Sequence, residues 1–217
     1  MFGIQDLAVF IVSGLLLNLA PGPDSLLIIT RSAAQGWRAG SAAALGVGSG
    51  TFVHIFAAAL GLSALLATSA TAFMLVKLIG AGYLLYVGAA LLLTKIPQVE
   101  AAPDTLDATK PLAVFSYQKI YWQGFLTNAL NPKVAVFFLA FVPQFIAASA
   151  VNKPLAFIVL GCIFNFNGML WCHFLAVSTA FASRRVRINQ RLTLWLNRAI
   201  GALFVSFGIK LALSGSS

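Results

Sequence analysis

Two short segments of the chain combine charged or amide side chains with residues that interrupt a helix. The first holds a carboxylate, an amide and three helix breakers: Asn18, Pro21, Gly22, Pro23 and Asp24. The second lies 110 residues further along, counted from Gly14 to Gly124, and holds an ammonium, two amides and a proline: Asn128, Asn131, Pro132 and Lys133. Because proline lacks a backbone N–H and glycine relaxes the chain, both segments free backbone groups beside these side chains. Such groups together can bind a small charged ligand.

Both segments lie inside long apolar stretches, and this restricts where such breaks can occur. Freed N–H and C=O groups in hydrocarbon need partners, so a broken helix persists only where protein or a water-filled cavity lines the break. Interrupted segments at corresponding positions of two halves are typical of a transporter's binding site. The two segments therefore predict a small transporter, with the residues named above as its binding site.

Asp24 is the only acid within an apolar stretch, and Lys133 is the only base deep inside one. Each costs roughly 2.5–3.5 kcal/mol to insert at the centre of a bilayer, which favours a functional role. Local alternatives remain open, because Asp24 can cap the helix that restarts after Pro23 and Lys133 can extend to the interface. The asparagines can serve freed backbone groups instead of a ligand. Four further polar residues are secondary candidates, either for bonds between helices or for a proton relay: His54, Asn165, Asn167 and His173.

The composition identifies an integral membrane protein. Of the 217 residues, 60% are hydrophobic and 9% are charged, and the mean hydropathy is +0.92, whereas a soluble domain carries about 25% charged residues. The formal charge of +9 comes from bases scattered between apolar stretches. That distribution is typical of cytoplasmic loops and argues against a nucleic-acid partner. We expect a multi-pass protein in the lipid bilayer.

Six apolar stretches approach the length of about 20 residues that a membrane span needs: 7–30, 40–66, 71–93, 121–145, 155–182 and 192–213. A polar segment separates the third stretch from the fourth. The predicted organisation is a first three-helix repeat, a cytoplasmic linker and a second three-helix repeat, at residues 1–94, 95–120 and 121–217.

Weak internal similarity supports the two repeats. Ile79-Gly-Ala81 recurs as Ile200-Gly-Ala202, and Gly88 is followed at a similar offset by Gly208. Two copies of three spans must enter the membrane from opposite sides. The expected fold class is therefore an all-α integral membrane protein with six transmembrane helices, arranged as two inverted three-helix repeats with proline-broken first and fourth helices.

The basic residues set the expected orientation, because lysine and arginine concentrate in cytoplasmic loops. Ten of the 14 lie in or beside three connections that share one side of the membrane: residues 31–38, 95–119 and 184–198. We expect these connections to be cytoplasmic, with both termini outside. Since the first apolar stretch has no bases at its amino end, an arrangement with five spans stays open.

Small residues crowd the second stretch between Gly40 and Gly50 and let helices approach closely. This predicts tight packing within one subunit, with the seam of a homo-oligomer or a sliding surface as alternatives. The two cysteines, Cys162 and Cys172, are interpreted as buried small hydrophobes. No Gly-x-Ser-x-Gly, His-Glu-x-x-His, paired-carboxylate or Walker motif is present, so we expect no enzyme, cofactor or metal site.

The motifs resemble those of a known family. Asn18-Leu-Ala-Pro-Gly-Pro-Asp-Ser25, Gly36-x-Arg38-Ala-Gly40 and Lys77-Leu-Ile-Gly-Ala-Gly-Tyr-Leu-Leu-Tyr-Val-Gly88 resemble the amino-terminal half of the LysE/RhtB amino-acid exporters. Gly124-Phe-Leu-Thr-Asn-Ala-Leu-Asn-Pro-Lys133, followed by Phe141-Val-Pro-Gln-Phe145, resembles their second half. The resemblance covers nearly the whole chain and looks closer to the homoserine/threonine/leucine-type branch than to exporters of basic amino acids.

The resemblance implies a secondary active exporter of amino acids or close derivatives across the bacterial inner membrane, driven by the proton gradient. The wider superfamily supplies two alternatives, a metal-ion exporter and a thiol-disulfide electron carrier. For an amino-acid substrate, helix amino ends after Pro23 and Pro132, together with Lys133, suit the carboxylate. Asp24 and the carbonyls freed before each break suit the ammonium. Since opposite charges in a low-dielectric interior are tolerated mainly as a pair, we expect Asp24 and Lys133 to lie close together.

Overall fold

The structure is a computed structural model that describes residues 2–64, 70–93, 116–147, 149–181 and 190–213. These residues are almost entirely helical, and their only β-pairing is an isolated antiparallel bridge between Ile4 and Ile146. The long α-helices are α1 (Leu7–Leu19), α2 (Pro23–Gln35), α3 (Trp37–Phe56), α5 (Ala70–Leu92), α6 (Tyr117–Ala129), α8 (Lys153–Phe181) and α9 (Gln190–Leu213). The π-helical turn η1 (Ala57–Leu62) extends α3, and α7 (Pro132–Val136) continues into the π-helical η2 (Phe137–Phe141) and the 3-10 turn η3 (Val142–Phe145).

Both proline-containing segments are broken, as the sequence predicts. α1 and α2 meet at a bend of 53°, and α6 meets the segment Pro132–Phe145 at a bend of 45°. Pro23 and Pro132 each open a new helix, where the fixed φ of proline suits the first helical position and its missing N–H is not needed. The Asn131 side chain caps the second of these helices, because its Oδ1 accepts from Lys133 N at 3.0 Å. Gly22, the residue before α2, has no side chain to do the same.

The helices of the described residues supply two to four candidate membrane spans by length and composition. Trp37–Leu62 and Lys153–Phe181 each qualify alone, with 26 and 29 residues. The pairs α1 with α2 and α6 with Pro132–Phe145 qualify if each bent pair is counted as one span. The chain is thus a multi-pass helical membrane protein. α6 begins at Tyr117, so the last residues of the predicted 95–120 linker are helical; residues 94–115 lie outside the described part of the chain.

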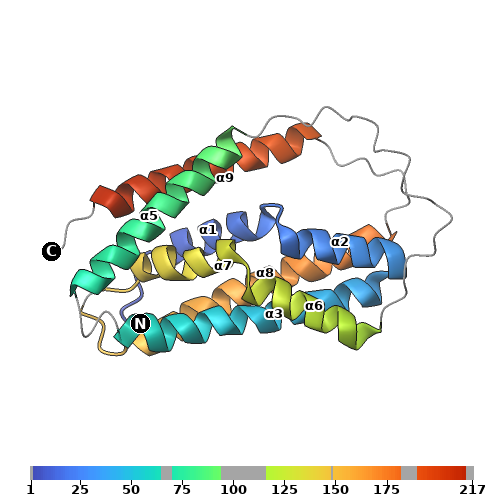
Figure 1. Cartoon of the computed structure of the whole chain (residues 1–217), viewed down its shortest axis with the longest axis horizontal. Coiled ribbons are helices and arrows are strands. Elements are labelled where there is room, and N and C mark those ends of the chain that lie inside the picture. Colours follow the sequence, from blue (N-terminus) through green and yellow to red (C-terminus); the bar gives the residue numbers. More distant parts are fainter. Residues whose placement is uncertain (1, 65–69, 94–115, 148, 182–189, 214–217) are drawn as a thin grey trace.

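Figure 1 shows α5 and α9 crossing beside a bundle formed by the other helices, with the start of α1 and the end of α9 toward one end of the molecule. α2 ends and α3 and α6 begin at the opposite end. Arg31, Arg38 and Lys119 belong to these helix ends. The described members of the predicted cytoplasmic set on these three helices therefore lie together, away from the start of α1 and the end of α9.

The crossing of α5 and α9 has the pairing that an inverted repeat would produce. A Cβ added at Gly88 would meet the backbone of Gly201, and one added at Gly208 would meet Leu85 and the Ala81 carbonyl. In the alignment of the halves, Gly201 corresponds to Gly80 and Gly208 to Gly88. The two contacts therefore relate to each other by exchange of the halves, to within one residue.

Close packing of α3 on α6 brings the second broken segment to the centre of the bundle. Cβ atoms built at Gly46 and Gly50 would fall within 3.0 Å of the α6 backbone, at Tyr121 and Phe125, and one built at Gly124 would reach Ala43. The small residues of α3 thus pack within one subunit. Two apolar clusters lie on either side of the breaks: a Phe-rich one that includes Phe10, Phe137 and Phe145, and one of smaller side chains that includes Ala43 and Ala176.

We expect Gly46→Ala to destabilise the protein, because the added methyl group has no room between α3 and α6. Overpacking of this kind typically costs about 1–3 kcal/mol. Gly82→Ala is the matched control, since a Cβ at this helical position of α5 meets nothing within 4 Å. Its better helix propensity should leave the stability unchanged or raise it by up to about 1 kcal/mol. Thermal unfolding of the two purified variants in detergent compares them, and equal Tm values would contradict the tight α3–α6 contact.

Candidate functional site

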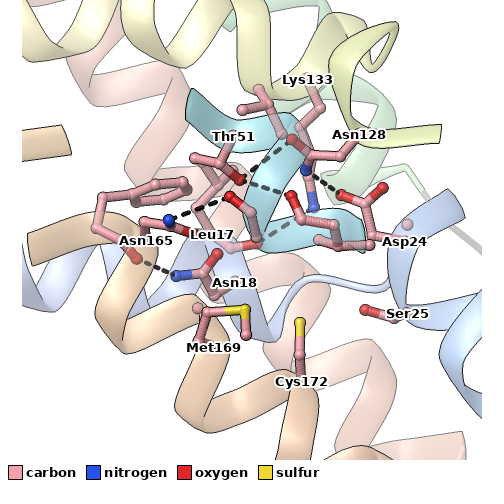
Figure 2. A pocket seen from close by; sticks show the side chains of 16 residues that line it. Leu17, Asn18, Asp24, Ser25, Thr51, Asn128, Lys133, Asn165, Met169 and Cys172 are labelled. Carbon is pink, nitrogen blue, oxygen red and sulfur yellow. Dashed lines mark hydrogen bonds between the residues drawn. The ribbon is translucent and has the colours of Figure 1, made fainter. Parts of the chain in front are cut away.

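The two helix breaks meet at a small enclosed cavity near the middle of the bundle (Figure 2). Its volume is about 30 Å³. α1, α2, α3, α6, α7 and α8 all contribute to its wall, and the lining residues are Leu17, Asn18, Gly22, Asp24, Ser25, Val47, Gly48, Thr51, Asn128, Lys133, Val134, Phe164, Asn165, Gly168, Met169 and Cys172. Both halves of the chain therefore build one site.

Asp24 is bound by the second break rather than by its own helix. Its Oδ2 accepts hydrogen bonds from Asn128 Nδ2 at 2.9 Å and Asn131 Nδ2 at 3.1 Å. The other carboxylate oxygen, Oδ1, is buried and has no hydrogen-bond partner among the residues that the structure describes. The residue that caps α2 is Gly22, and Asp24 lies in the first turn. The local alternative of Asp24 as the helix cap is therefore wrong.

Lys133 replaces a hydrogen bond that a proline removes. In an unbroken helix, the Leu17 carbonyl would accept from the N–H of residue 21, but residue 21 is a proline. Lys133 Nζ instead donates to Leu17 O at 3.2 Å and to Ala20 O at 3.1 Å. The ammonium thus lies against the carboxyl end of α1, where the helix dipole also favours a positive charge. Lys133 does not extend to the membrane interface.

Asp24 and Lys133 line the same cavity but do not form a direct ion pair. Each uses its hydrogen bonds on other groups: two amides for the carboxylate and two carbonyls for the ammonium. The prediction that they lie close together is met by their shared cavity. They do not pair directly: the Lys133 ammonium is bonded to two carbonyls, and the amides of Asn128 and Asn131 hold only one of the two Asp24 oxygens.

His54 serves the second break as Lys133 serves the first. The helical partner of the Asn128 carbonyl would be residue 132, which is also a proline. His54 Nε2 lies 2.9 Å from Asn128 O, and because a carbonyl only accepts, this nitrogen carries the hydrogen. His54 does not line the cavity. His54 therefore forms a hydrogen bond between α3 and α6, which is one of the two interpretations that the sequence left open.

Thr51 orients the Asn128 amide. Its Oγ1 lies 3.1 Å from Asn128 Oδ1 and donates to it or to Val47 O, also at 3.1 Å. With the amide oxygen turned to Thr51, the NH₂ group points at Asp24. The reverse orientation would place two oxygens in contact, so the network itself selects this one.

The helix α8 closes the cavity on the side of the first break. Asn18 Nδ2 donates weakly to Phe164 O at 3.5 Å, and Asn165 Nδ2 donates to Gly48 O at 3.1 Å. Asn18 of α1 therefore bonds to α8, a helix of the second half, and Asn128 of α6 bonds to α3, a helix of the first half. Each break is thus bonded to a helix of the other half. Figure 2 shows Asn165, Met169 and Cys172 along this wall.

The structure brings six of the thirteen residues that the sequence singled out to the cavity wall: Asn18, Gly22, Asp24, Asn128, Lys133 and Asn165. Asn131 is buried directly behind Asp24, whereas the rings of Pro21, Pro23 and Pro132 are exposed and only break the helices. Asn167 and His173 do not reach the cavity, and His173 Nδ1 bonds the Met169 carbonyl of its own helix.

Sequence reasoning missed several lining residues, notably Thr51, Met169 and Cys172. A helical signal for the last two was present. Residues 165, 168, 169 and 172 follow the i, i+3, i+4, i+7 spacing of one helix face, so a polar Asn165 in the site implied the others.

The two cysteines differ in their surroundings. Cys172 is buried and lines the cavity, whereas Cys162 is exposed on the same helix. Ten residues of helix separate them by about 15 Å, which excludes a disulfide between them. Among the described residues, no group of three His, Cys, Asp or Glu side chains is placed to hold a metal ion.

The cavity is small. A cavity needs roughly 10–15 Å³ for the centre of a water-sized probe in order to hold one water molecule, so about 30 Å³ holds very few. A ligand with several heavy atoms does not fit unless the side chains that line the cavity move apart.

A helical membrane protein with charged and amide residues at two converging helix breaks has the features of a transmembrane transporter. A family model described as LysE type translocator matches residues 15–215, and the chain belongs to this family. The leucine efflux proteins of Salmonella typhimurium (strain LT2) and Enterobacter sp. (strain 638) are each 30% identical to it, with 97% of this chain and 96% and 97% of theirs covered. An uncharacterized membrane protein of Pseudomonas aeruginosa is 32% identical, with 97% and 96% covered. No solved structure matches the chain.

Proposed function

We propose that the protein is a secondary active exporter that moves neutral amino acids, with leucine as the first candidate, out across the bacterial inner membrane in exchange for protons. One observation carries the proposal: the only acid and the only deep base of the apolar stretches line one enclosed cavity at two helix breaks. Charged groups inside a membrane are rare and mark transport pathways. The relatives named as leucine efflux proteins support the choice of substrate.

The cavity offers separate partners to the parts of a neutral amino acid. Asp24 Oδ1, buried without a partner, suits the ammonium. The start of α2, where Gly22 and Ser25 line the cavity, presents backbone N–H groups and the positive helix end to the carboxylate. The aliphatic side chain would lie against the apolar part of the wall, formed by Leu17, Val47, Val134, Phe164 and Met169.

Lys133 has a role at the first break in addition to the one that the sequence suggested for the substrate carboxylate. Its ammonium already occupies the Leu17 and Ala20 carbonyls, so these carbonyls are not available to the ammonium of a substrate. Lys133 keeps the first break in shape and places a positive charge near the site for the carboxylate. In this structure, the Lys133 ammonium occupies the carbonyls that the sequence suggested for the ammonium of a substrate.

We further propose six spans in two inverted halves that rock about the breaks to give alternating access. The reciprocal α5–α9 contacts support the inverted repeat. The grouping of Arg31, Arg38 and Lys119 at the end where α2 ends and α3 and α6 begin supports a cytoplasmic location for that end. A homo-oligomer stays a prediction, since the small residues of α3 are used inside the subunit.

The alternatives from the wider superfamily fit the site less well. A metal-ion exporter needs several ligands together, and the described residues provide no such cluster. A thiol-disulfide carrier needs two thiols that can approach each other. Of the two present, only Cys172 reaches the cavity.

An efflux assay tests the proposal. Cells that overproduce the protein in a host without its own leucine exporters are loaded with leucine-containing dipeptides, and amino acids inside and outside are measured by mass spectrometry. We expect a lower internal leucine pool and faster appearance of leucine outside than in cells with an empty vector. Equal leucine pools, combined with loss of a divalent metal from the cells, would favour the metal-exporter alternative instead.

A further inference from the structure

One carboxylate oxygen of Asp24 is hydrogen-bonded, and the other has no hydrogen-bond partner among the described residues. Oδ2 accepts from two amide groups of the second half, at 2.9 Å from Asn128 and 3.1 Å from Asn131. Oδ1 is buried without any partner. A buried acceptor left unpaired is costly, so this oxygen gains from any donor that reaches it. Because two amides already donate to Oδ2, only Oδ1 is left for a proton or an ammonium, and a protonated carboxyl no longer carries the negative charge that attracts an ammonium.

The titratable and charged groups around Asp24 leave Oδ1 without a resident cation. Lys133 faces the cavity from α7, but its ammonium is bonded to the Leu17 and Ala20 carbonyls. From α3, His54 is bonded to the Asn128 carbonyl, and from α8, Cys172 contributes a thiol. The remaining charges on the helices packed against α2 lie near helix ends: Arg38 on α3, Lys119 on α6, Lys153 on α8 and Arg31 on α2 itself, which bonds Gln123. His173 on α8 bonds the Met169 carbonyl.

We propose that Asp24 Oδ1 holds either a proton or the ammonium of the substrate, never both, and that this competition couples export to the proton gradient. The inference rests on the proposed export function and adds how the site enforces the exchange. Because Oδ2 is held by two amides, the ammonium and the proton have to use the same oxygen. Asn128 and Asn131 are positioning residues in this scheme.

The exchange balances in protons and charge. On the cytoplasmic side, the substrate ammonium displaces the proton from Oδ1, and that proton leaves to the cytoplasm. On the outer side, the zwitterion departs and a proton from outside takes its place on Oδ1. Each cycle exports one neutral zwitterion and imports one proton. One positive charge therefore moves inward, so both the pH difference and an interior-negative membrane potential drive export.

Proton counting on the purified full-length protein in detergent tests the inference. Leucine is titrated by calorimetry in two buffers of different ionisation enthalpy, from about pH 5 to about pH 8, the range in which a buried carboxylate can change its protonation. We expect up to one proton to be released per leucine bound at the acid end. There the apparent affinity for leucine should fall by up to about tenfold for each unit by which the pH is lowered. Asp6→Asn, which changes an exposed acid, should leave both results unchanged.

Variants assign the proton to Asp24. Asp24→Asn should release no proton, because its amide cannot exchange one. Should this variant bind leucine too weakly to measure, Asp24→Glu keeps a carboxylate in a different position and should release the proton with a shifted pH midpoint. His54→Gln and Cys172→Ser should still release a proton wherever they bind leucine.

Three results would overturn the inference. The first is leucine binding by the unaltered protein without proton release at any pH. The second is a proton release that Asp24→Asn retains or that Asp24→Glu leaves at the same midpoint. Both of these leave export itself standing. The third, absence of leucine binding by the unaltered protein, overturns the proposed leucine export and the inference with it.

Discussion

Replacing Asp24 by asparagine is expected to remove most of the export activity while the protein still reaches the membrane at its normal level. The new amide oxygen can accept from Asn128 and Asn131 as Oδ2 does, so the local geometry is retained. The negative charge is lost, and with it the charge-assisted bond to a substrate ammonium. Such a bond contributes about 1.5–3 kcal/mol, which corresponds to about a ten- to hundred-fold loss of affinity. Removing a charge that the bilayer penalises should leave insertion unharmed.

The measurement is leucine efflux from cells, normalised to the amount of protein in the membrane fraction. Asp6→Asn is the matched control, because it makes the same chemical change at an exposed acid whose side chain makes no capping bond. Efflux by this control should equal that of the unaltered protein. Full activity in Asp24→Asn would remove Asp24 from the site.

Replacing Lys133 by methionine is expected to abolish export and also to destabilise the fold. The Leu17 carbonyl has no helical partner because residue 21 is a proline, and the Ala20 carbonyl lies in the break. Both accept from Lys133 Nζ, at 3.2 Å and 3.1 Å. A buried carbonyl left unpaired costs about 1–3 kcal/mol. Methionine has a similar length and no donor, so it fills the space without replacing either bond.

Efflux and the Tm in detergent should both fall in Lys133→Met. Lys119→Met is the control, since Lys119 is exposed at the start of α6 and the same change there should alter neither measurement. An unchanged Tm with lost efflux would assign the ammonium to the substrate rather than to the break. Unchanged efflux would exclude Lys133 from both roles.

The positions of the helix breaks followed from the sequence because their cause is local. Pro21, Pro23 and Pro132 carry no N–H, so the carbonyls that precede them lose their helical partners in any fold. The membrane class followed from the scarcity of charge, and the family from the two motifs. Asp24 and Lys133 were recognisable as functional candidates because a bilayer makes isolated charges costly.

The partners of these groups were decided only by the tertiary structure. The sequence placed a donor at Lys133 and removed the helical partners of the Leu17 and Asn128 carbonyls, but nothing local states which distant donor reaches which carbonyl. Lys133 is 116 residues from Leu17, and His54 is 74 residues from Asn128. Close packing of the small residues of α3 on α6 brings His54 to Asn128. Lys133 bonds the Leu17 and Ala20 carbonyls instead of Asp24.

The same reason explains the free oxygen of Asp24 and the place of Cys172. A capping role for Asp24 was locally plausible, but the Asn128 and Asn131 amides approach from the other half and take its Oδ2. The spacing of Cys172 from Asn165 places both on one helix face, but only the packing of α8 against the other helices turns that face to the cavity. Breaks and unmatched charges are properties of the chain itself, whereas the hydrogen bonds that satisfy them depend on how residues far apart in sequence pack together.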